Sequence, residues 1–227
     1  DFVWIDMQHG LHDFSSVEHA VRTADLVGVT SIVRPYSHDP GVLCKVADLR
    51  PAAVMVPMIN TPEQAETIVQ LLRYAPRGNR SYGGRRIIDV EGREYYRKSN
   101  PVIFLQIETM QAVDNAERIA AVDDVDALFF GPDDMRVSLG LPINIPVQES
   151  DKLRQAVEAT ARAFQKADKH GGIVAATPES VEFVTGAGYQ VIVSGSDNGF
   201  LRQGATAKFE QMRPTDKNRT ASQDAVY

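Results

Sequence analysis

The chain has 227 residues, of which 43% are hydrophobic and 24% are charged, and its formal net charge is -6. This length suits a single domain, and the composition is ordinary for a folded protein. The acidic balance, without a block of Lys and Arg, argues against a nucleic-acid or membrane surface. No apolar run approaches the ~20 residues that cross a bilayer. The single cysteine, Cys44, cannot form an internal disulfide, which fits a cytoplasmic, reducing setting.

Short apolar runs bounded by turn residues predict seven strands, and the stretches between them have the pattern of helices. The strands are expected near 2–6, 31–35, 53–58, 102–108, 127–131, 171–176 and 190–194. Helices are expected near 16–27, 40–48, 62–72, 112–121, 150–168, 178–186 and 198–211. Buried strands that alternate with helices indicate a parallel sheet, and we predict a (β/α)8 TIM barrel. A closed barrel needs eight strands, so we expect one further βα unit of roughly 30 residues before Asp1.

Helix starts are marked by capping residues. Ser15-Ser-Val-Glu18 and Thr61-Pro-Glu-Gln64 have the spacing of capping boxes, in which two side chains satisfy backbone N–H groups of the first turn. Pro40, Pro62 and Pro178 each follow a capping residue, at the first helical position.

Two segments fall outside the βα pattern. The Gly- and Arg-rich stretch 74–100 is too long for a plain connection, and we predict an active-site lid there. The residues after Pro214 are polar and form a tail. The expected organisation is a barrel domain at 1–212, lacking its first strand, and a C-terminal tail at 213–227.

Glu108 and Asp134 end two consecutive predicted strands. The carboxyl ends of barrel strands meet at one mouth, where barrel enzymes have their active sites. Two carboxylates there can converge on one cation, and oxygen ligands favour Mg²⁺ or Mn²⁺. The alternative is that each carboxylate is solvated or caps the following helix.

Three further side chains follow strands. Asp6 and His9 have a spacing that lets the carboxylate accept from one imidazole nitrogen and leaves the other nitrogen as a base, unless His9 is an inert loop residue. Arg34 leaves its strand with a planar fork that suits a carboxylate or an enolate oxygen, or else closes the barrel rim as an ion pair. Gln106 lies two residues before Glu108 and therefore points to the same face.

The turn Gly131-Pro132-Asp133 follows the next strand and leads to Asp134. Backbone N–H groups of such a turn form a concave site for anions. We therefore expect this turn to hold a substrate carboxylate.

Together these segments resemble the successive motifs of the HpcH/HpaI aldolase family. The residues that carry the resemblance, in chain order, are Asp6-Met-Gln-His9-Gly, Val33-Arg34-Pro35, Val56-Pro57-Met58, Gln106-Ile-Glu108-Thr, Gly131-Pro-Asp-Asp134 with Ser138-Leu-Gly140, and Gly195-Ser-Asp197. The likeness covers nearly the whole chain. One departure is Gln8, because the family usually carries a glutamate at this place.

The resemblance implies a barrel of the phosphoenolpyruvate/pyruvate type and a class II aldolase. Such an enzyme cleaves a 4-hydroxy-2-oxo acid reversibly to pyruvate and an aldehyde. On this reading Glu108 and Asp134 bind a divalent metal, Mg²⁺ or Mn²⁺ with Co²⁺ as another option. Arg34 and Gln106 contact the keto oxygen, and Arg34 stabilises the pyruvate enolate. His9, oriented by Asp6, moves the proton at the aldol hydroxyl.

The resemblance also implies a homo-oligomer, with a hexamer as the expected state. The apolar residues Phe200, Leu201, Phe209 and Met212 favour an oligomer independently, because a helix with so many large apolar groups needs a partner surface. Two alternatives to an aldolase stay open. One is an oxaloacetate decarboxylase or a macrophomate-synthase-like enzyme that uses the same enolate, and the other is a non-catalytic barrel that binds a keto acid.

Overall fold

The structure, a computed structural model, describes residues 1–98 and 100–213. The chain divides into two compact units, Asp1–Val193 and Ser194–Tyr227. The expected tail at 213–227 lies outside the described residues apart from Arg213, so the boundary at 212 stays a prediction.

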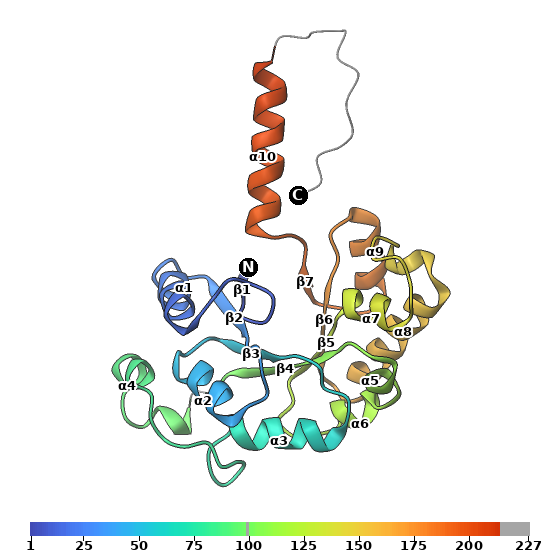
Figure 1. The fold of residues 1–227 in the computed structure, drawn as a ribbon. Helices are drawn as coiled ribbons and strands as arrows, with labels where there is room; N and C mark the ends of the chain where they lie inside the picture. The colour runs from blue at the N-terminus through green and yellow to red at the C-terminus, as the bar shows by residue number, and fades with distance from the viewer. Residues whose placement is uncertain (99, 214–227) are drawn as a thin grey trace. The chain divides into compact units, whose positions relative to one another are not determined.

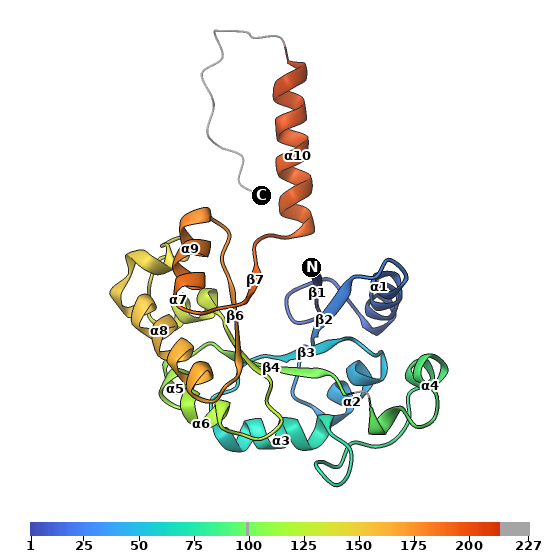
Figure 2. The same ribbon diagram turned by 180° about the vertical axis from the view of Figure 1, so that it is seen from behind.

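Seven parallel strands form one sheet that follows the order of the sequence. The strands are β1 (Phe2–Asp6), β2 (Thr30–Arg34), β3 (Ala53–Val56), β4 (Val102–Ile107), β5 (Ala127–Phe130), β6 (His170–Val174) and β7 (Val191–Val193). The sheet curls into a nearly closed barrel with the helices of residues 1–193 around its outside (Figures 1 and 2). The predicted TIM-type α/β barrel and its seven strands are confirmed.

The helices connect successive strands over the outside of the sheet. They are α1 (Phe14–Leu26), α2 (Pro40–Asp48), α3 (Pro62–Leu72), α4 (Arg85–Glu91), α5 (Met110–Asp114), α6 (Ala116–Ala120), α7 (Pro132–Ser138), α8 (Asp151–Lys166) and α9 (Pro178–Gly186), with 3-10 turns at Tyr95–Arg97 and Val147–Glu149. The structure adds α4 and α7 to the predicted helices and divides the one expected at 112–121 into α5 and α6. Within the described residues, no helix combines the length and the apolarity that a membrane span requires.

Side chains alternate between the two faces of the strands, which produces two apolar layers. Outward side chains such as Val33 and Leu105 pack under the helices in the larger layer. Inward side chains, among them Ile32, Met55 and Phe129, fill the barrel interior. The same alternation carries polar side chains inward one step beyond this apolar filling, at the carboxyl ends of the strands.

β6 has two adjacent glycines because aromatic rings occupy the space on both of its faces. A Cβ at Gly171 would lie 2.1 Å from the ring of Phe164, and a Cβ at Gly172 would lie 2.5 Å from the ring of Phe129. Phe164 belongs to the outer layer and Phe129 to the barrel interior. The close approach of each ring therefore requires glycine.

The helix starts agree with the capping signals at α2, α3 and α9. Thr61 and Gln64 form the expected capping box of α3. The capping box expected at Ser15 is wrong, because α1 begins earlier, with Asp13 accepting from the N–H of Ser16 and Ser16 accepting from the N–H of Asp13. Cys44 lies half-buried in α2.

The predicted lid over the mouth, 74–100, is wrong because this segment lies at the other end of the barrel. It connects the end of α3 to the start of β4, so it runs past the amino-terminal ends of the strands. Arg80 pairs with Asp48 at 2.7 Å, and Arg86 donates to the Leu49 carbonyl at 2.9 Å. Both partners lie at the end of α2, which anchors the segment at the base of the barrel.

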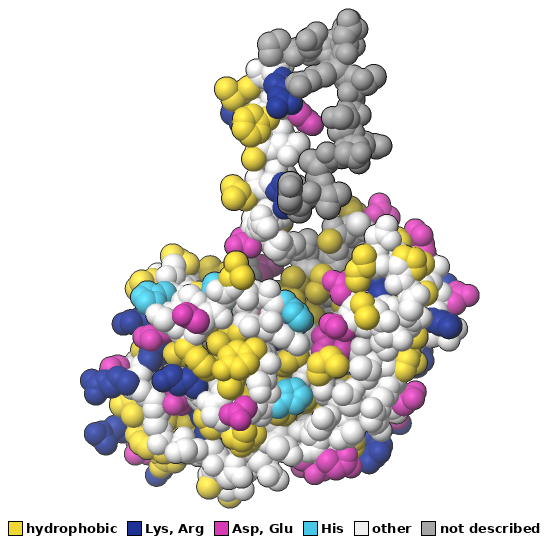
Figure 3. Space-filling view, in the orientation of Figure 1, with side chains coloured by type: hydrophobic (Ala, Val, Ile, Leu, Met, Phe, Trp, Pro, Cys, Tyr) yellow, Lys and Arg dark blue, Asp and Glu magenta, His cyan; other side chains and the backbone are white. Residues whose placement is uncertain are grey.

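The second unit contains one helix, α10 (Asp197–Met212), which Ser196 caps by accepting from the N–H of Gly199 at 3.2 Å. None of its residues is buried. Leu201, Phe209 and Met212 are all more than half exposed, and their spacing places them on one side of the helix together with Ala205. Figure 3 shows hydrophobic side chains along one side of α10.

Candidate active site

Asp6 and Arg34 end β1 and β2 and lie directly opposite each other in the parallel register. Their side chains form a bidentate pair, in which Arg34 Nε donates to one carboxylate oxygen at 2.8 Å and Nη2 to the other at 2.7 Å. Burial raises the pKa of Asp6, but the hydrogen bonds and charge of Arg34 outweigh it and hold this pKa below its usual range. The pair therefore stays charged and gives the guanidinium one fixed plane.

Arg34 is 7% exposed and is also held from below and from the side. Its Cζ lies 4.6 Å from the ring centre of Trp4, which packs edge-on against Phe129 in the barrel interior. Its Nη1 donates to Gln106 Oε1 at 3.3 Å. A guanidinium has five N–H groups, so two remain for a ligand beside Gln106 after these three bonds.

Glu108 directly follows β4 and is only 2% exposed. Its Oε2 accepts the backbone N–H of Met58 at 2.8 Å. Burial raises the pKa of Glu108 to about 7, with a contribution from the nearby Asp134 carboxylate, against the lowering effects of the Met58 N–H and of Arg34. A buried carboxylate with a second carboxylate beside it is favourable only when a proton or a cation neutralises its charge.

The turn after β5 is the first turn of α7, and its residues differ in their contacts. Asp134 is exposed and lies close to Glu108. The Asp133 side chain is also exposed and pairs with Arg136 at 2.7 Å, so it offers only its backbone to a ligand. Gly131 donates its N–H to the Ile107 carbonyl at 3.0 Å, and Pro132 has no N–H.

The expectation that Gly131 and Pro132 contribute N–H groups to an anion site therefore needs correction. The N–H groups of Asp133 and Asp134 belong to the first turn, which leaves them without partners in the helix. Gly131 serves the site in a different way. A Cβ there would lie 2.5 Å from Cγ and 2.7 Å from Oε1 of Glu108, so glycine makes room for the buried carboxylate.

His9 is exposed on the loop after β1, and its relation to Asp6 differs from the expectation. The Asp6 carboxylate accepts the backbone N–H groups of Gln8 at 2.9 Å and His9 at 3.3 Å, but it does not accept from the imidazole. Within residues 1–98 and 100–213 the His9 ring has no hydrogen-bond partner. Asp6 thus orients Arg34 and the loop backbone, while the His9 ring is free at the mouth.

Three residues at this end of the barrel had no role assigned from the sequence. Trp4 lies under Arg34, Met58 holds Glu108, and His38 donates to the Pro57 carbonyl. Trp4 lies two residues before Asp6 on β1, so its side chain points to the same inward face. The alternation of the strand could therefore have predicted its position. Met58 has φ 57°, for which the sequence contains no signal.

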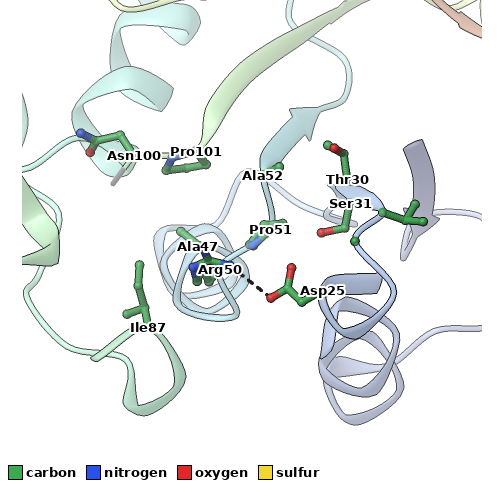
Figure 4. Close-up of a pocket in the computed structure, with 12 residues that line it drawn as sticks. Asp25, Thr30, Ser31, Ala47, Arg50, Pro51, Ala52, Ile87, Asn100 and Pro101 are labelled. Carbon is green, nitrogen blue, oxygen red and sulfur yellow. Dashed lines mark hydrogen bonds and ion pairs between the residues drawn. The ribbon is translucent and has the colours of Figure 1, made fainter. Parts of the chain in front are cut away.

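A cavity of about 320 Å³ lies at the opposite end of the barrel, near the starts of β2, β3 and β4 (Figure 4). Its wall includes Thr30, Ser31, Ala52 and Pro101, and Arg50 reaches Asp25 there at 3.2 Å. Asp6, Arg34 and Glu108 lie at the carboxyl ends of the strands, at the other end of the barrel. This cavity is therefore no part of the candidate active site.

The donor set at the mouth fits a hard divalent cation. Glu108 and Asp134 supply two carboxylates, and such cations prefer oxygen ligands while keeping positions open for water or substrate. Among the described residues there is no cluster of three or more His, Cys, Asp or Glu side chains suited to a metal. Glu108 and Asp134 are the two residues that would hold the ion.

A barrel with two carboxylates and an anchored arginine at the carboxyl ends of its strands has the architecture of a barrel enzyme. The model of the family HpcH/HpaI aldolase/citrate lyase matches residues 1–203. The chain belongs to this family, and it is an enzyme of the aldolase class.

Several characterised proteins are similar over most of their length. A hydroxypyruvate/pyruvate aldolase of Rhizorhabdus wittichii is 30% identical over 207 residues, which cover 90% of this chain and 82% of the relative. A 4-hydroxy-2-oxovalerate aldolase of Novosphingobium aromaticivorans is 34% identical, with 90% of this chain and 79% of the relative covered.

Solved structures show the same likeness. An HpcH/HpaI aldolase/citrate lyase family protein of Burkholderia cenocepacia has a TM-score of 0.85 at 28% identity, covering 94% of this chain and 86% of that protein. Macrophomate synthase has a TM-score of 0.79 at 26% identity, covering 93% and 77%.

Proposed function

We propose that the protein is a divalent-metal-dependent aldolase that cleaves a 4-hydroxy-2-oxo acid to pyruvate and an aldehyde. The observation that carries the proposal is the meeting of the buried Glu108, Asp134 and the anchored Arg34 at one barrel mouth. The family and the relatives named as pyruvate aldolases support it. Mg²⁺ or Mn²⁺ is the preferred metal, and Co²⁺ is an alternative.

The chain's own residues provide most of the requirements of this reaction. Cleavage of the carbon–carbon bond leaves negative charge on the keto oxygen of pyruvate. The two spare N–H groups of Arg34 are fixed in place before the substrate arrives, so they stabilise this charge without reorganisation. Gln106 positions the guanidinium from the other side. A bound divalent ion would add Lewis-acid stabilisation of the same charge.

We assign the proton transfer at the aldol hydroxyl to His9. The aldol hydroxyl must lose a proton as the bond breaks, and the exposed imidazole at the mouth can accept it. The N–H groups of Asp133 and Asp134 complete the site by holding the substrate carboxylate.

The first test measures binding of Mn²⁺ by calorimetry. Glu108→Gln and Asp134→Asn should each lose tight binding and activity while still folding cooperatively, because each removes one anionic oxygen ligand. Asp123→Asn, an exposed carboxylate before β5, is the matched control and should bind like the wild type. Unchanged affinity in both site variants would reject the metal assignment.

Oxaloacetate decarboxylation is the second candidate, and the free position of His9 favours it. The enolate-stabilising group of Arg34, Gln106 and Glu108 is complete without the His9 ring. His9→Ala should therefore lose most aldol cleavage and keep appreciable decarboxylation. Arg34→Lys should impair both, because a point charge does not reproduce the planar fork. Equal loss of both activities in His9→Ala would contradict this division.

We further propose that the enzyme is a cytoplasmic homo-oligomer, with a hexamer as the expected state. The apolar side of α10 supports an assembly because it is exposed in the single chain. A second copy of this chain is the partner we propose for it.

A further inference from the structure

One peptide group connects two side chains at the barrel mouth. The bond between Pro57 and Met58 lies directly after β3. Its N–H, from Met58, donates to Glu108 Oε2 at 2.8 Å, and its carbonyl, from Pro57, is hydrogen-bonded to His38 Nε2. His38 and Glu108 thus contact the same planar unit from its two sides.

The Pro57–Met58 peptide determines which group donates in each of these two hydrogen bonds. A carbonyl oxygen only accepts, so His38 Nε2 carries the hydrogen. In a trans peptide the C=O and N–H groups point in opposite directions, and a bond to the oxygen polarises the N–H. The donor of His38 therefore both orients and strengthens the N–H that Glu108 accepts.

This peptide needs to be held because its conformation is unfavourable. Met58 has φ 57°, a left-handed conformation that costs a residue with a side chain roughly 1–2 kcal/mol. Neighbouring groups are pinned separately, since Ile59 donates to the Gln106 carbonyl at 3.2 Å and Asn60 donates to the Met58 carbonyl at 3.2 Å. Among bonds within the described residues, only those to His38 and Glu108 hold the Pro57–Met58 peptide itself.

We propose that His38 is a positioning residue for Glu108, acting through the Pro57–Met58 peptide. His38 is not one of the proposed metal or substrate ligands, and its ring bonds the Pro57 carbonyl. Its donor keeps the Met58 N–H aimed at one oxygen of Glu108 and leaves the other oxygen directed to the mouth. This inference rests on the proposed role of Glu108 as a metal ligand.

The test compares two variants of nearly equal shape. His38→Gln places an amide N–H near the position of Nε2, whereas His38→Met has similar length and no donor. Removal of an outer partner of a metal ligand typically weakens metal binding about 10- to 100-fold. We expect the Mn²⁺ dissociation constant, measured by calorimetry without substrate, to rise about tenfold in His38→Met and to stay within about threefold of wild type in His38→Gln.

Two controls separate the outcomes. His19→Ala removes an exposed histidine whose ring also bonds a backbone carbonyl, on α1, and should leave the dissociation constant unchanged. Unfolding of each variant in EDTA shows whether the fold is intact, and His38→Ala replaces His38→Met if the latter does not fold.

The pattern of results distinguishes the two proposals. If Glu108→Gln abolishes Mn²⁺ binding but His38→Met and His38→Gln bind equally, the positioning role is overturned and the metal site stands. If Glu108→Gln binds as tightly as the wild type, Glu108 is no ligand and both proposals fall. Weak binding in His38→Met with recovery in His38→Gln supports the inference.

Discussion

Glu108 is the residue of the candidate active site whose pKa is raised by its surroundings. Its pKa is raised to about 7 in the fold, mainly by burial, against 4.5 for the free side chain. A carboxyl group with a raised pKa stabilises the fold below its unfolded pKa, and this contribution disappears as pH rises through the folded pKa. The metal-free protein should therefore lose stability between about pH 5 and pH 8, by on the order of 3 kcal/mol.

The measurement is denaturant unfolding of the EDTA-treated protein across this range, with Glu108→Gln as the reference. The variant lacks the titrating group, so the wild type should lose stability relative to it as pH rises. A constant difference between the two proteins would contradict the raised pKa.

Gly131 gives a second prediction at the residue scale. In Gly131→Ala the new methyl group meets the Glu108 side chain at 2.5 Å, so the carboxylate must move. We expect a loss of stability of about 1–3 kcal/mol and clearly weaker Mn²⁺ binding by calorimetry. Gly186→Ala is the control, because a Cβ there meets nothing within 4 Å. Normal metal binding in Gly131→Ala would show that the carboxylate does not need this space.

Sequence reasoning selected the residues of the candidate site, but it did not predict all of their hydrogen-bond partners. Asp6, Arg34, Gln106 and Glu108 could be selected because each lies at the end of an apolar run. The pairing of Asp6 with Arg34 in place of the His9 ring depends on the register of two strands 28 residues apart. The three-residue spacing of Asp6 and His9 does not show that Arg34, from another strand, takes the place of the His9 ring.

At the scale of the elements, the strands and most helices could be predicted because each has a continuous apolar face. The helix expected at 112–121 is interrupted at Asn115, whose side chain donates to the Asn60 carbonyl at 2.8 Å. The segment 74–100 was misplaced for a different reason. Its length indicated a functional loop, but only the order of elements shows at which end of the barrel it lies.

The prediction for α10 concerns assembly. Leu201→Glu combined with Phe209→Glu places two charges on its apolar side, and the oligomer should dissociate because buried charges are unfavourable there. Ala207→Glu is exposed on the opposite side and should leave assembly unchanged. Light scattering gives the molar mass of each variant. A wild type that is monomeric and fully active at micromolar concentration would refute the proposed oligomer.

At the scale of the whole molecule, the proposed active site lies at one end of the barrel, and we expect the side chains at the other end to stabilise the fold. Arg73 is 3% exposed at the base and donates to the Pro101 carbonyl at 2.8 Å and to the Asp126 carboxylate at 3.0 Å. Arg73→Leu should destabilise the fold by about 3 kcal/mol, because it removes the buried donor of the Pro101 carbonyl and the cationic partner of Asp126. Arg77→Leu removes an exposed partner of Asp124 and should change stability by less than about 1 kcal/mol.

Guanidinium unfolding measures both effects, and specific activity is measured on the folded fraction. The activity of both variants should equal that of the wild type, because side chains at the amino-terminal ends of the strands lie away from the mouth. A large loss of activity in folded Arg73→Leu would show that the two ends are coupled.

The glycine pair of β6 restricts the order in which this barrel can change during evolution. Ala at position 172 is excluded while Phe129 keeps its ring, and Ala at position 171 is excluded while Phe164 keeps its own. Each aromatic must therefore become smaller before its glycine can acquire a side chain, and the intermediate then carries a cavity. Neighbouring substitutions of this kind are not additive. Divergence within this barrel is thus expected to proceed through the mouth loops, while each glycine changes only with its own aromatic partner or both remain as they are.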